Sequence, residues 1–411
     1  MPLLVIGLAL GCLALRVAVL ADLHLDPAFV GTGTGTSLCR RPSTEQPAPL
    51  SRAGCDSSRR LVELTLDALE DVGPIDAIFY LGDLGPHQVG SVKALQQAFD
   101  EARELLERSE VPIFPVLGNN DVHPNYHVKE RDDPLVRAYA DVFRSRMGDA
   151  AYHSFCQYGY YAVDLGEFRV VALNTVHYSP RAPSRPEDSD QQLEWLNETL
   201  RTAEIEGRKV IILTHTPFGI NAHDGTITTR DTPTLRFRAL VRRYRRTLSL
   251  ILHGHYHAAY PASIAIGTRV LVPVLVCPSI APSNDNDPGF YILELDSPDA
   301  PDYLHYALDL AEANAALRAG ELPQYALIYR FSQRYAPWLG RECPLTSTCI
   351  ERLYQLTPAR PSLWSQLAAA ATGLRCDRRR PFLCSAVSET PEQYATCIGH
   401  EPQHVPPSAR S

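Results

Sequence analysis

Five short clusters of Asp, Asn and His residues stand out in the first two-thirds of the chain. They are Asp22-Leu23-His24, Gly82-Asp83, Gly118-Asn119-Asn120-Asp121, Thr214-His215 and His253-Gly254-His255-Tyr256-His257. A single cluster is weak evidence, since Asp and Asn beside Gly commonly form turns. Three His in alternation are harder to explain, because a buried His needs polar partners. Mixed oxygen and nitrogen ligands suit zinc, iron or manganese better than magnesium or calcium. The clusters together predict a metal site.

Apolar runs that predict buried strands come directly before all five clusters. Strands are expected at residues 16–21, 77–81, 113–117, 168–173, 209–213, 248–252 and 270–276, and helices at 59–69 and 95–107. This alternation is typical of layered α/β proteins. In such folds ligands gather at strand ends, and alternate residues of an extended segment point the same way. The five clusters should therefore converge on one edge of the protein, with Asp22 and His24 able to bind the same ion.

The length and composition predict a large globular domain with an appended region. The chain has 411 residues, of which 45% are hydrophobic and 21% charged, and its net charge is −8. We expect a catalytic domain over residues 16–300 and a helical region over 301–400, because Ala and Leu are frequent at 308–317, 322–336 and 362–371. Residues 401–411 should form a flexible tail. The Arg clusters are short and isolated, which does not favour nucleic-acid recognition.

The N-terminus and the cysteines indicate an oxidising compartment. Residues 2–15 are apolar but too short to span a bilayer as a helix, so residues 1–15 are interpreted as a signal peptide or hydrophobic N-terminus. Ten Cys are many for a cytosolic enzyme. Cys39 with Cys55, Cys343 with Cys349 and Cys384 with Cys397 are the candidate bridges. A secreted or otherwise extracytoplasmic protein is expected, in a lysosome- or vacuole-like compartment or at the cell surface.

The order of the clusters resembles that of the calcineurin-type metallophosphoesterases across residues 16–292. The run from Asp22 to Pro27, followed by Cys39, by Cys55-Asp56-Ser57 and by His87 after Gly-Asp, is similar to the acid sphingomyelinase-like phosphodiesterases. This resemblance implies an α/β fold, a two-layer β-sandwich flanked by helices, with a dimetal site at the strand ends and a helical, Cys-containing C-terminal region.

The resemblance also implies two sets of metal ligands that share Asp83. One ion would be held by Asp22, His24, Asp83 and His257, and the other by Asp83, Asn119, His215 and His255. Zinc is the metal that the family implies. A hydroxide between ions about 3.5–4 Å apart would attack phosphorus. The expected activity is hydrolysis of a phosphodiester or phosphoanhydride in a small substrate, such as a nucleotide, a phospholipid head group or polyphosphate.

Asn120 departs from the family pattern. Sphingomyelinase-like members usually have His at this place, as the proton donor to the leaving oxygen, and an amide cannot act as an acid. Asp121 keeps the acid position but lacks the His that it would orient, so His87 is the natural substitute and His123 a weaker one. The Gly-Asn-Asn-Asp sequence resembles the endopolyphosphatases, whose phosphate leaving group needs less protonation than an alkoxide. Asn120 thus favours nucleotides or polyphosphate over sphingomyelin.

Two alternatives stay open at this point. The chain could be an endopolyphosphatase, or a catalytically silent member that keeps its metals and acts as a binding protein. Contact with a membrane surface and the oligomeric state also stay open, because nothing in the sequence decides them.

Overall fold

The computed structural model describes most of the chain. The described residues are 15–33, 38–42, 44–129, 131–183, 186–221, 224–266, 269–356, 363, 367, 384–385, 388 and 390–399. The hydrophobic run before Leu15, most of the helix predicted at 362–371 and the tail at 401–411 lie outside them. None of the helices in the described part is both long and apolar enough to cross a membrane.

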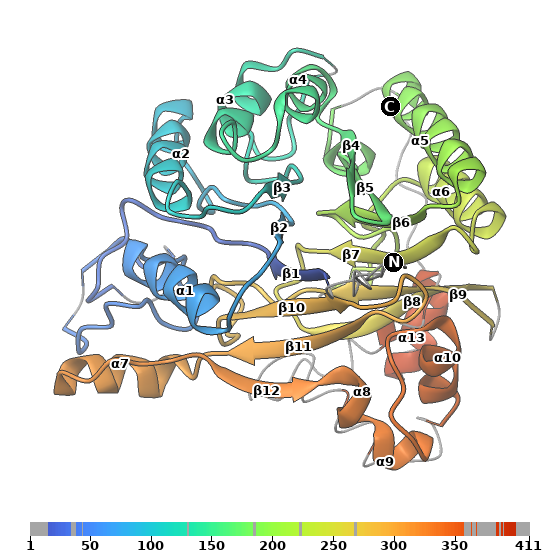
Figure 1. Ribbon diagram of the computed structural model, residues 1–411. Helices are drawn as coiled ribbons and strands as arrows, with labels where there is room; N and C mark the ends of the chain where they lie inside the picture. Colours follow the sequence, from blue (N-terminus) through green and yellow to red (C-terminus); the bar gives the residue numbers. More distant parts are fainter. Residues whose placement is uncertain are drawn as a thin grey trace, which may run out of the picture.

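Two six-stranded mixed sheets form the framework (Figure 1). The first has the order β12 (Ala326–Arg330), β11 (Asp302–Ala307), β10 (Gly289–Leu295), β1 (Leu15–Leu20), β2 (Ala77–Tyr80), β3 (Ile113–Pro115). The second has the order β4 (Tyr161–Leu165), β5 (Phe168–Ala172), β6 (Lys209–Thr214), β7 (Leu248–His253), β9 (Arg269–Val276), β8 (Tyr260–Ile266). Strands β1 to β3 are parallel, as are β5, β6, β7 and β9. The predicted two-layer α/β fold is confirmed.

Helices flank both sheets. They are α1 (Arg59–Asp71), α2 (Val92–Leu106), α3 (Pro134–Val142), α4 (Asp149–Tyr158), α5 (Pro186–Glu206) and α6 (Asp231–Arg243). In Figure 1, α1 and α2 lie beside the first sheet and α5 and α6 beside the second. The hydroxyl oxygens of Ser58 and Ser91 accept backbone N–H bonds at the start of α1 and α2, as N-cap residues do. Both predicted helices are confirmed.

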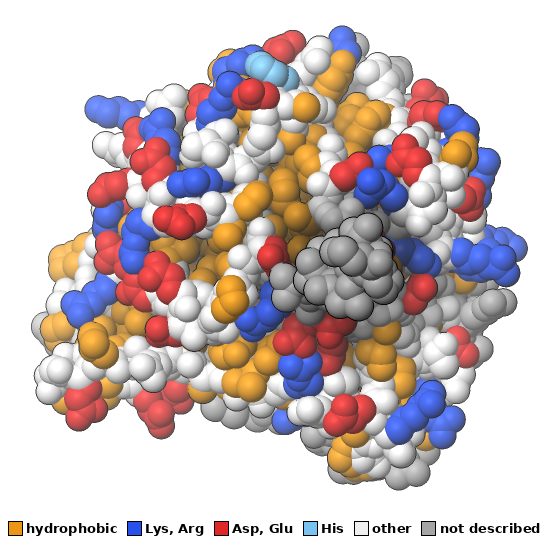
Figure 2. All heavy atoms as spheres, in the orientation of Figure 1, with side chains coloured by type: hydrophobic (Ala, Val, Ile, Leu, Met, Phe, Trp, Pro, Cys, Tyr) orange, Lys and Arg blue, Asp and Glu red, His pale blue; other side chains and the backbone are white. Residues whose placement is uncertain are grey.

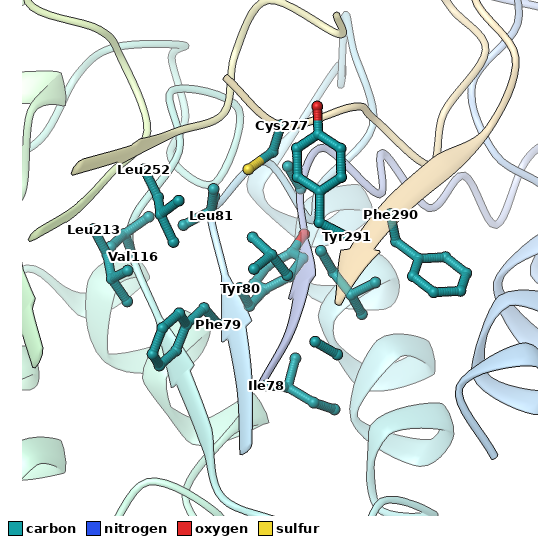
Figure 3. Packing of buried hydrophobic residues seen from close by; sticks show 14 of the residues in the cluster. Ile78, Phe79, Tyr80, Leu81, Val116, Leu213, Leu252, Cys277, Phe290 and Tyr291 are labelled. Atoms are coloured by element: carbon teal, nitrogen blue, oxygen red, sulfur yellow. The ribbon is translucent and has the colours of Figure 1, made fainter. Parts of the chain in front are cut away.

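Apolar side chains from the two sheets pack together near the carboxyl ends of the parallel strands. Figure 3 shows Leu81, Val116, Leu213 and Leu252 close together, and all four are fully buried. Each lies within three residues of a predicted metal ligand. Burial of a Leu or Val side chain contributes roughly 1.5–3 kcal/mol, so this part of the core fixes the strand ends from which the polar loops begin.

The C-terminal region differs from the prediction. Helix α7 (Leu310–Ala319) matches the first predicted helix, but β11 and β12 extend the first sheet across the expected boundary at residue 300. The predicted helix at 322–336 was wrong: β12 occupies its centre, followed by the short helices α8 (Phe331–Arg334) and α9 (Ala336–Leu339). Antiparallel pairing with β11 and the packing of Tyr329 against Tyr303 override the helix-forming composition.

Helices α10 (Ser347–Leu356) and α13 (Pro391–Ile398) follow, and the three predicted disulfides are confirmed. Cys39 is bonded to Cys55, Cys343 to Cys349 and Cys384 to Cys397. Cys156 and Cys277 are free and buried. Three disulfides fit an oxidising compartment.

The surface charges are mixed on the face shown in Figure 2. Lys and Arg side chains there are interspersed with Asp and Glu, and the described residues of this face form no continuous basic area.

Candidate dimetal site

The seven predicted metal ligands come together where the two sheets meet. Asp22 and His24 follow β1, Asp83 follows β2, Asn119 follows β3, His215 follows β6, and His255 and His257 follow β7. All except the half-buried His255 are buried. The predicted ligands therefore lie at the carboxyl ends of parallel strands in both sheets.

Asp83 occupies the centre of the group. Its Oδ2 lies 3.3 Å from Nε2 of His215 and 3.6 Å from Nε2 of His24. Its carboxylate belongs to two three-residue groups of metal-binding atoms, Asp22/His24/Asp83 and Asp83/His215/His255, whose atoms lie within 4.8 Å of one another in each group. One carboxylate shared by two such groups is the arrangement expected of a bridging ligand.

The atoms of the first predicted set converge. Nε2 of His24 lies 3.1 Å from Nε2 of His257, and Oδ1 of Asp22 lies 3.5 Å from Nε2 of His257. In the second set, Oδ1 of Asn119 lies 3.0 Å from Nε2 of His215. Imidazole nitrogens and carboxylate oxygens that face one another at these distances fit the ligand shell of a divalent cation.

Hydrogen bonds behind the rings orient the imidazoles. Nδ1 of His24 lies 3.0 Å from the Gly85 carbonyl oxygen, and Nδ1 of His215 lies 2.8 Å from that of Leu81. A carbonyl oxygen only accepts, so Nδ1 donates and Nε2 faces the centre of the site. The far nitrogens of metal-binding His are commonly held in this way.

Charges in the site favour a cation beside His215. Burial lowers the pKa of His215, but the carboxylates of Asp83 and Asp22 outweigh it and raise the pKa to about 9. Burial lowers the pKa of His24 well below its usual value, and the neighbouring His87 adds to that effect. The negative charges of Asp22 and Asp83 thus favour a cation at the position that the predicted ligands surround.

Five of the seven predicted ligands have left-handed backbone conformations. The φ angles are 52° for Asp22, 41° for His24, 57° for Asp83, 70° for His255 and 52° for His257. Non-glycine residues adopt such angles uncommonly, and those that do concentrate at functional sites. The turns after β1, β2 and β7 therefore direct these side chains into the centre at a local conformational cost.

Two glycines allow the loops after β2 and β3 to touch. A Cβ atom on Gly82 would lie 2.7 Å from the Gly118 nitrogen, and one on Gly118 would lie 2.1 Å from the Asp83 nitrogen. Only glycine permits this close approach of the two backbones, which explains why Gly precedes both Asp83 and Asn119.

Asp121 joins the same two loops. Its carboxylate is buried and accepts hydrogen bonds of 2.7 to 3.0 Å from four backbone N–H groups, those of Asp83, Leu84, Gly85 and Gly118. Burial and the charge of Asp83 raise the pKa of Asp121 to about 7, while the N–H donors oppose that rise. This geometry favours a positioning role over the catalytic role predicted from the sequence.

Asn120 contacts Asp83. Its backbone N–H donates to Oδ1 of Asp83 at 2.7 Å and its side-chain Nδ2 donates to Oδ2 at 2.7 Å. The side chain of Asn125 donates to Oδ1 of Asn120 and accepts from Nδ2 of Asn119 at 3.4 Å. Sequence reasoning missed Asn125, because a lone Asn after Pro reads as a turn residue.

His87 lies against the first ligand set. Its ring stacks on that of His24 with a centroid distance of 3.8 Å, and its side chain is 30% exposed. Nδ1 lies 2.7 Å from Oδ1 of the fully buried Asp56, and the His87 backbone N–H donates to Oδ2 of Asp56 at 2.8 Å. Burial lowers the pKa of His87, but the bond to Asp56 and the charges of Asp56, Asp83 and Asp22 together outweigh it and give a net rise. Asp56 was seen in the sequence only as part of the family motif.

The chemistry of this site agrees with the comparisons. A family model described as calcineurin-like phosphoesterase matches residues 15–259. The chain belongs to the calcineurin-like phosphoesterase family. Its site binds two divalent metal ions, and the chain is a phosphoric ester hydrolase that cleaves phosphodiesters in phosphorylated substrates.

Relatives place this phosphoesterase near the acid sphingomyelinases. It is 26% identical over 344 residues to the bovine (Bos taurus) cyclic GMP-AMP phosphodiesterase SMPDL3A, covering 76% of this chain and 74% of that protein. It is 25% identical to the mouse (Mus musculus) acid sphingomyelinase-like phosphodiesterase 3b, covering 77% and 75%. It is 26% identical to human (Homo sapiens) sphingomyelin phosphodiesterase, covering 78% and 54%. The predicted sphingomyelinase-like resemblance is confirmed.

Proposed function

We propose that this phosphoesterase hydrolyses phosphodiester or phosphoanhydride bonds with good leaving groups, as in nucleotides, and that it does so outside the cytoplasm with zinc at both metal positions. One observation carries the proposal. The backbone N–H and the side-chain amide of Asn120 both donate hydrogen bonds to the Asp83 carboxylate, so the residue that replaces the family's proton donor supports a predicted metal ligand. A site with one fewer acid is suited to leaving groups that need little protonation.

The ligand set supports zinc. Its atoms are imidazole nitrogens, carboxylate oxygens and one amide oxygen, and zinc accepts these ligands at low coordination number. Two divalent ions held there would polarise the phosphate oxygens and lower the pKa of a bound water. The chain itself supplies the shared carboxylate of Asp83 and the orientation of His24 and His215 by backbone carbonyls.

His87 is the residue that we propose as proton donor to the leaving oxygen. Asp56 holds Nδ1 of His87 at 2.7 Å, which leaves Nε2 as the remaining ring nitrogen for the substrate. The stack on His24 keeps the ring beside the metal ligands. A positioned acid of this kind contributes roughly 10²- to 10⁴-fold to the rate.

The names of the relatives include a nucleotide substrate. One set of relatives is named for cyclic GMP-AMP, a dinucleotide, and another for sphingomyelin. The three disulfides support an extracytoplasmic location.

A substrate comparison tests the proposal. The zinc-loaded chain is assayed with ATP, bis(p-nitrophenyl) phosphate, long-chain polyphosphate and sphingomyelin, beside an Asp83→Ala control. We expect turnover of ATP and the nitrophenyl ester, and at least about 100-fold lower kcat/KM for sphingomyelin, whose alkoxide needs an acid. Comparable turnover of sphingomyelin would contradict the proposal. A strong preference for polyphosphate over ATP would instead identify an endopolyphosphatase.

A further inference from the structure

Arg181 lies over the ring of Tyr126, with its guanidinium carbon 5.5 Å from the ring centroid. Arg181 is exposed, while Tyr126 is only 6% exposed. We propose that Arg181, supported by Tyr126, binds a second phosphate of the substrate, adjacent to the one that is cleaved. This rests on the proposed function and narrows its substrate class to molecules with two or more phosphates.

Tyr126 is attached to the metal site. Its backbone N–H donates to the carbonyl oxygen of Asn119 at 3.1 Å, and the preceding Asn125 bonds the side chains of both Asn119 and Asn120. Tyr126 has a φ of 67°, a left-handed conformation that a bulky residue adopts only when its surroundings impose it. The ring therefore has a fixed position relative to a predicted metal ligand.

Tyr126 contacts both the metal-site loop and Arg181. Its backbone N–H bonds the Asn119 carbonyl, and the Arg181 guanidinium lies over its ring. A substrate phosphate bound at the metal site would therefore have its neighbouring phosphate close to this ring.

The loop that carries Arg181 is held by Arg230. The backbone N–H of Arg230 donates to the Tyr178 carbonyl at 2.8 Å, and its guanidinium donates to the carbonyls of His177, at 3.2 Å, and Ala182. This loop follows β5, whose carboxyl end lies beside that of β6 and therefore beside His215. A guanidinium on an anchored loop loses less conformational entropy when it binds an anion.

Arg181 has no carboxylate partner among the described residues. Its guanidinium lies over the Tyr126 ring, and its backbone N–H donates to Oγ of Ser179 at 3.2 Å. Arg40, the cation beside His87, is engaged: its Nε donates to Asp26 at 2.7 Å and its guanidinium donates to the His87 and Gln88 carbonyls. A planar guanidinium that is held by an aromatic ring and lacks an acidic partner suits a phosphate.

Substitutions at Arg181 separate this inference from the proposed function. Wild type, Arg181→Ala and Arg181→Lys are compared on ATP, which has further phosphates, and on bis(p-nitrophenyl) phosphate, which has none. Arg131→Ala is the matched control, because Arg131 also lies over a tyrosine ring, at 4.8 Å from Tyr158. Turnover of the nitrophenyl ester by wild type reports on the proposed function alone.

We expect Arg181→Ala to lower kcat/KM for ATP about tenfold or more, mainly through KM, as the loss of a charged hydrogen bond would. Hydrolysis of the nitrophenyl ester should change less than about twofold. Arg181→Lys should lower kcat/KM for ATP less than Arg181→Ala does. Equal losses on both substrates, or an unchanged value for ATP, would overturn the inference. If wild type hydrolyses neither substrate, calorimetric binding of ADP to the zinc-loaded variants gives the same comparison as a ratio of Kd values.

Discussion

Asn120 and Asp83 are joined by two hydrogen bonds of 2.7 Å, one from the Asn120 backbone nitrogen and one from its side-chain nitrogen. Asp83 is the carboxylate shared by the two groups of metal-binding atoms. Asn120, which departs from the sphingomyelinase-like pattern, therefore has a structural role: it orients the carboxylate of Asp83.

Replacing Asn120 should affect metal affinity. Asn120→Ala removes the Nδ2 bond to the Asp83 carboxylate, and loss of a hydrogen bond to a metal ligand typically costs about 10- to 100-fold in affinity. Competition with a zinc chelator measures the change. The matched control is Asn125→Ala, which leaves both bonds to Asp83 in place and should weaken zinc less. Unchanged zinc affinity in Asn120→Ala would contradict the supporting role.

Restoring the family's histidine is a separate test of the same position. In a protein built around Asn120, Asn120→His should leave diesterase activity unchanged or lower it, because the bond to Asp83 is lost. A large gain in activity would show instead that the chain is a damaged enzyme of the sphingomyelinase type.

Loss of His87 should depend on the leaving group. His87→Ala should slow phosphodiesters with alkanol leaving groups about 100-fold more than those with p-nitrophenol, since nitrophenolate leaves without a proton. Asp56→Asn should show the same trend, because Asp56 holds Nδ1 of His87. His153→Ala, at an exposed position, is the control. Equal losses across the leaving-group series would rule out the proposed proton transfer.

Asp121 should matter for stability. Asp121→Asn places an amide where a carboxylate accepts four backbone N–H bonds. The amide nitrogen leaves two of these buried N–H groups without an acceptor, at a cost of roughly 1–3 kcal/mol each, so we expect the free energy of unfolding to fall by about 3 kcal/mol or more. Urea unfolding measures this, with the exposed Asp100→Asn as control. A change no larger than in the control would contradict the positioning role.

Metal removal should lower the melting temperature. Without cations, the buried Asp22 and Asp83 carboxylates lie within 4.8 Å of each other, and imidazoles, the Asn120 amide groups and the His255 backbone N–H are their partners. Zinc at 100 times its Kd would restore about 2.7 kcal/mol. Thermal unfolding with chelator, and again after zinc is returned, gives the difference. The Asp83→Ala variant should respond to zinc much less, and an equal response would argue against Asp83 as a shared ligand.

The convergence of the candidate site residues and the α/β fold class could be predicted from the sequence, but several strands could not. Ligands such as Asp83 and His215 follow buried parallel strands, so their convergence follows from strand direction alone. Strands β4, β8, β10 and β11 were missed, and β12 was predicted as helix. All five pair antiparallel with a neighbouring strand, and strand formation there depends on packing across the pair, which local sequence shows poorly.

The supporting contacts were also beyond the sequence. Asp56 reaches His87, and Asn125 reaches Asn119 and Asn120, only after the loops have folded against each other. The four N–H donors to Asp121 belong to loops after two different strands. Nearly every residue type carries a backbone N–H, so a sequence motif cannot identify these donors.

The most direct test of the dimetal account is hydrolysis of bis(p-nitrophenyl) phosphate by the zinc-loaded chain, beside Asp83→Ala. Both proteins are also analysed for bound zinc, and Asp164→Ala, an exposed carboxylate at the end of β4, controls for the substitution itself. The account predicts two zinc ions and turnover in wild type and the control, with both reduced in Asp83→Ala. Full zinc occupancy without turnover in wild type, or undiminished turnover in Asp83→Ala, would contradict it.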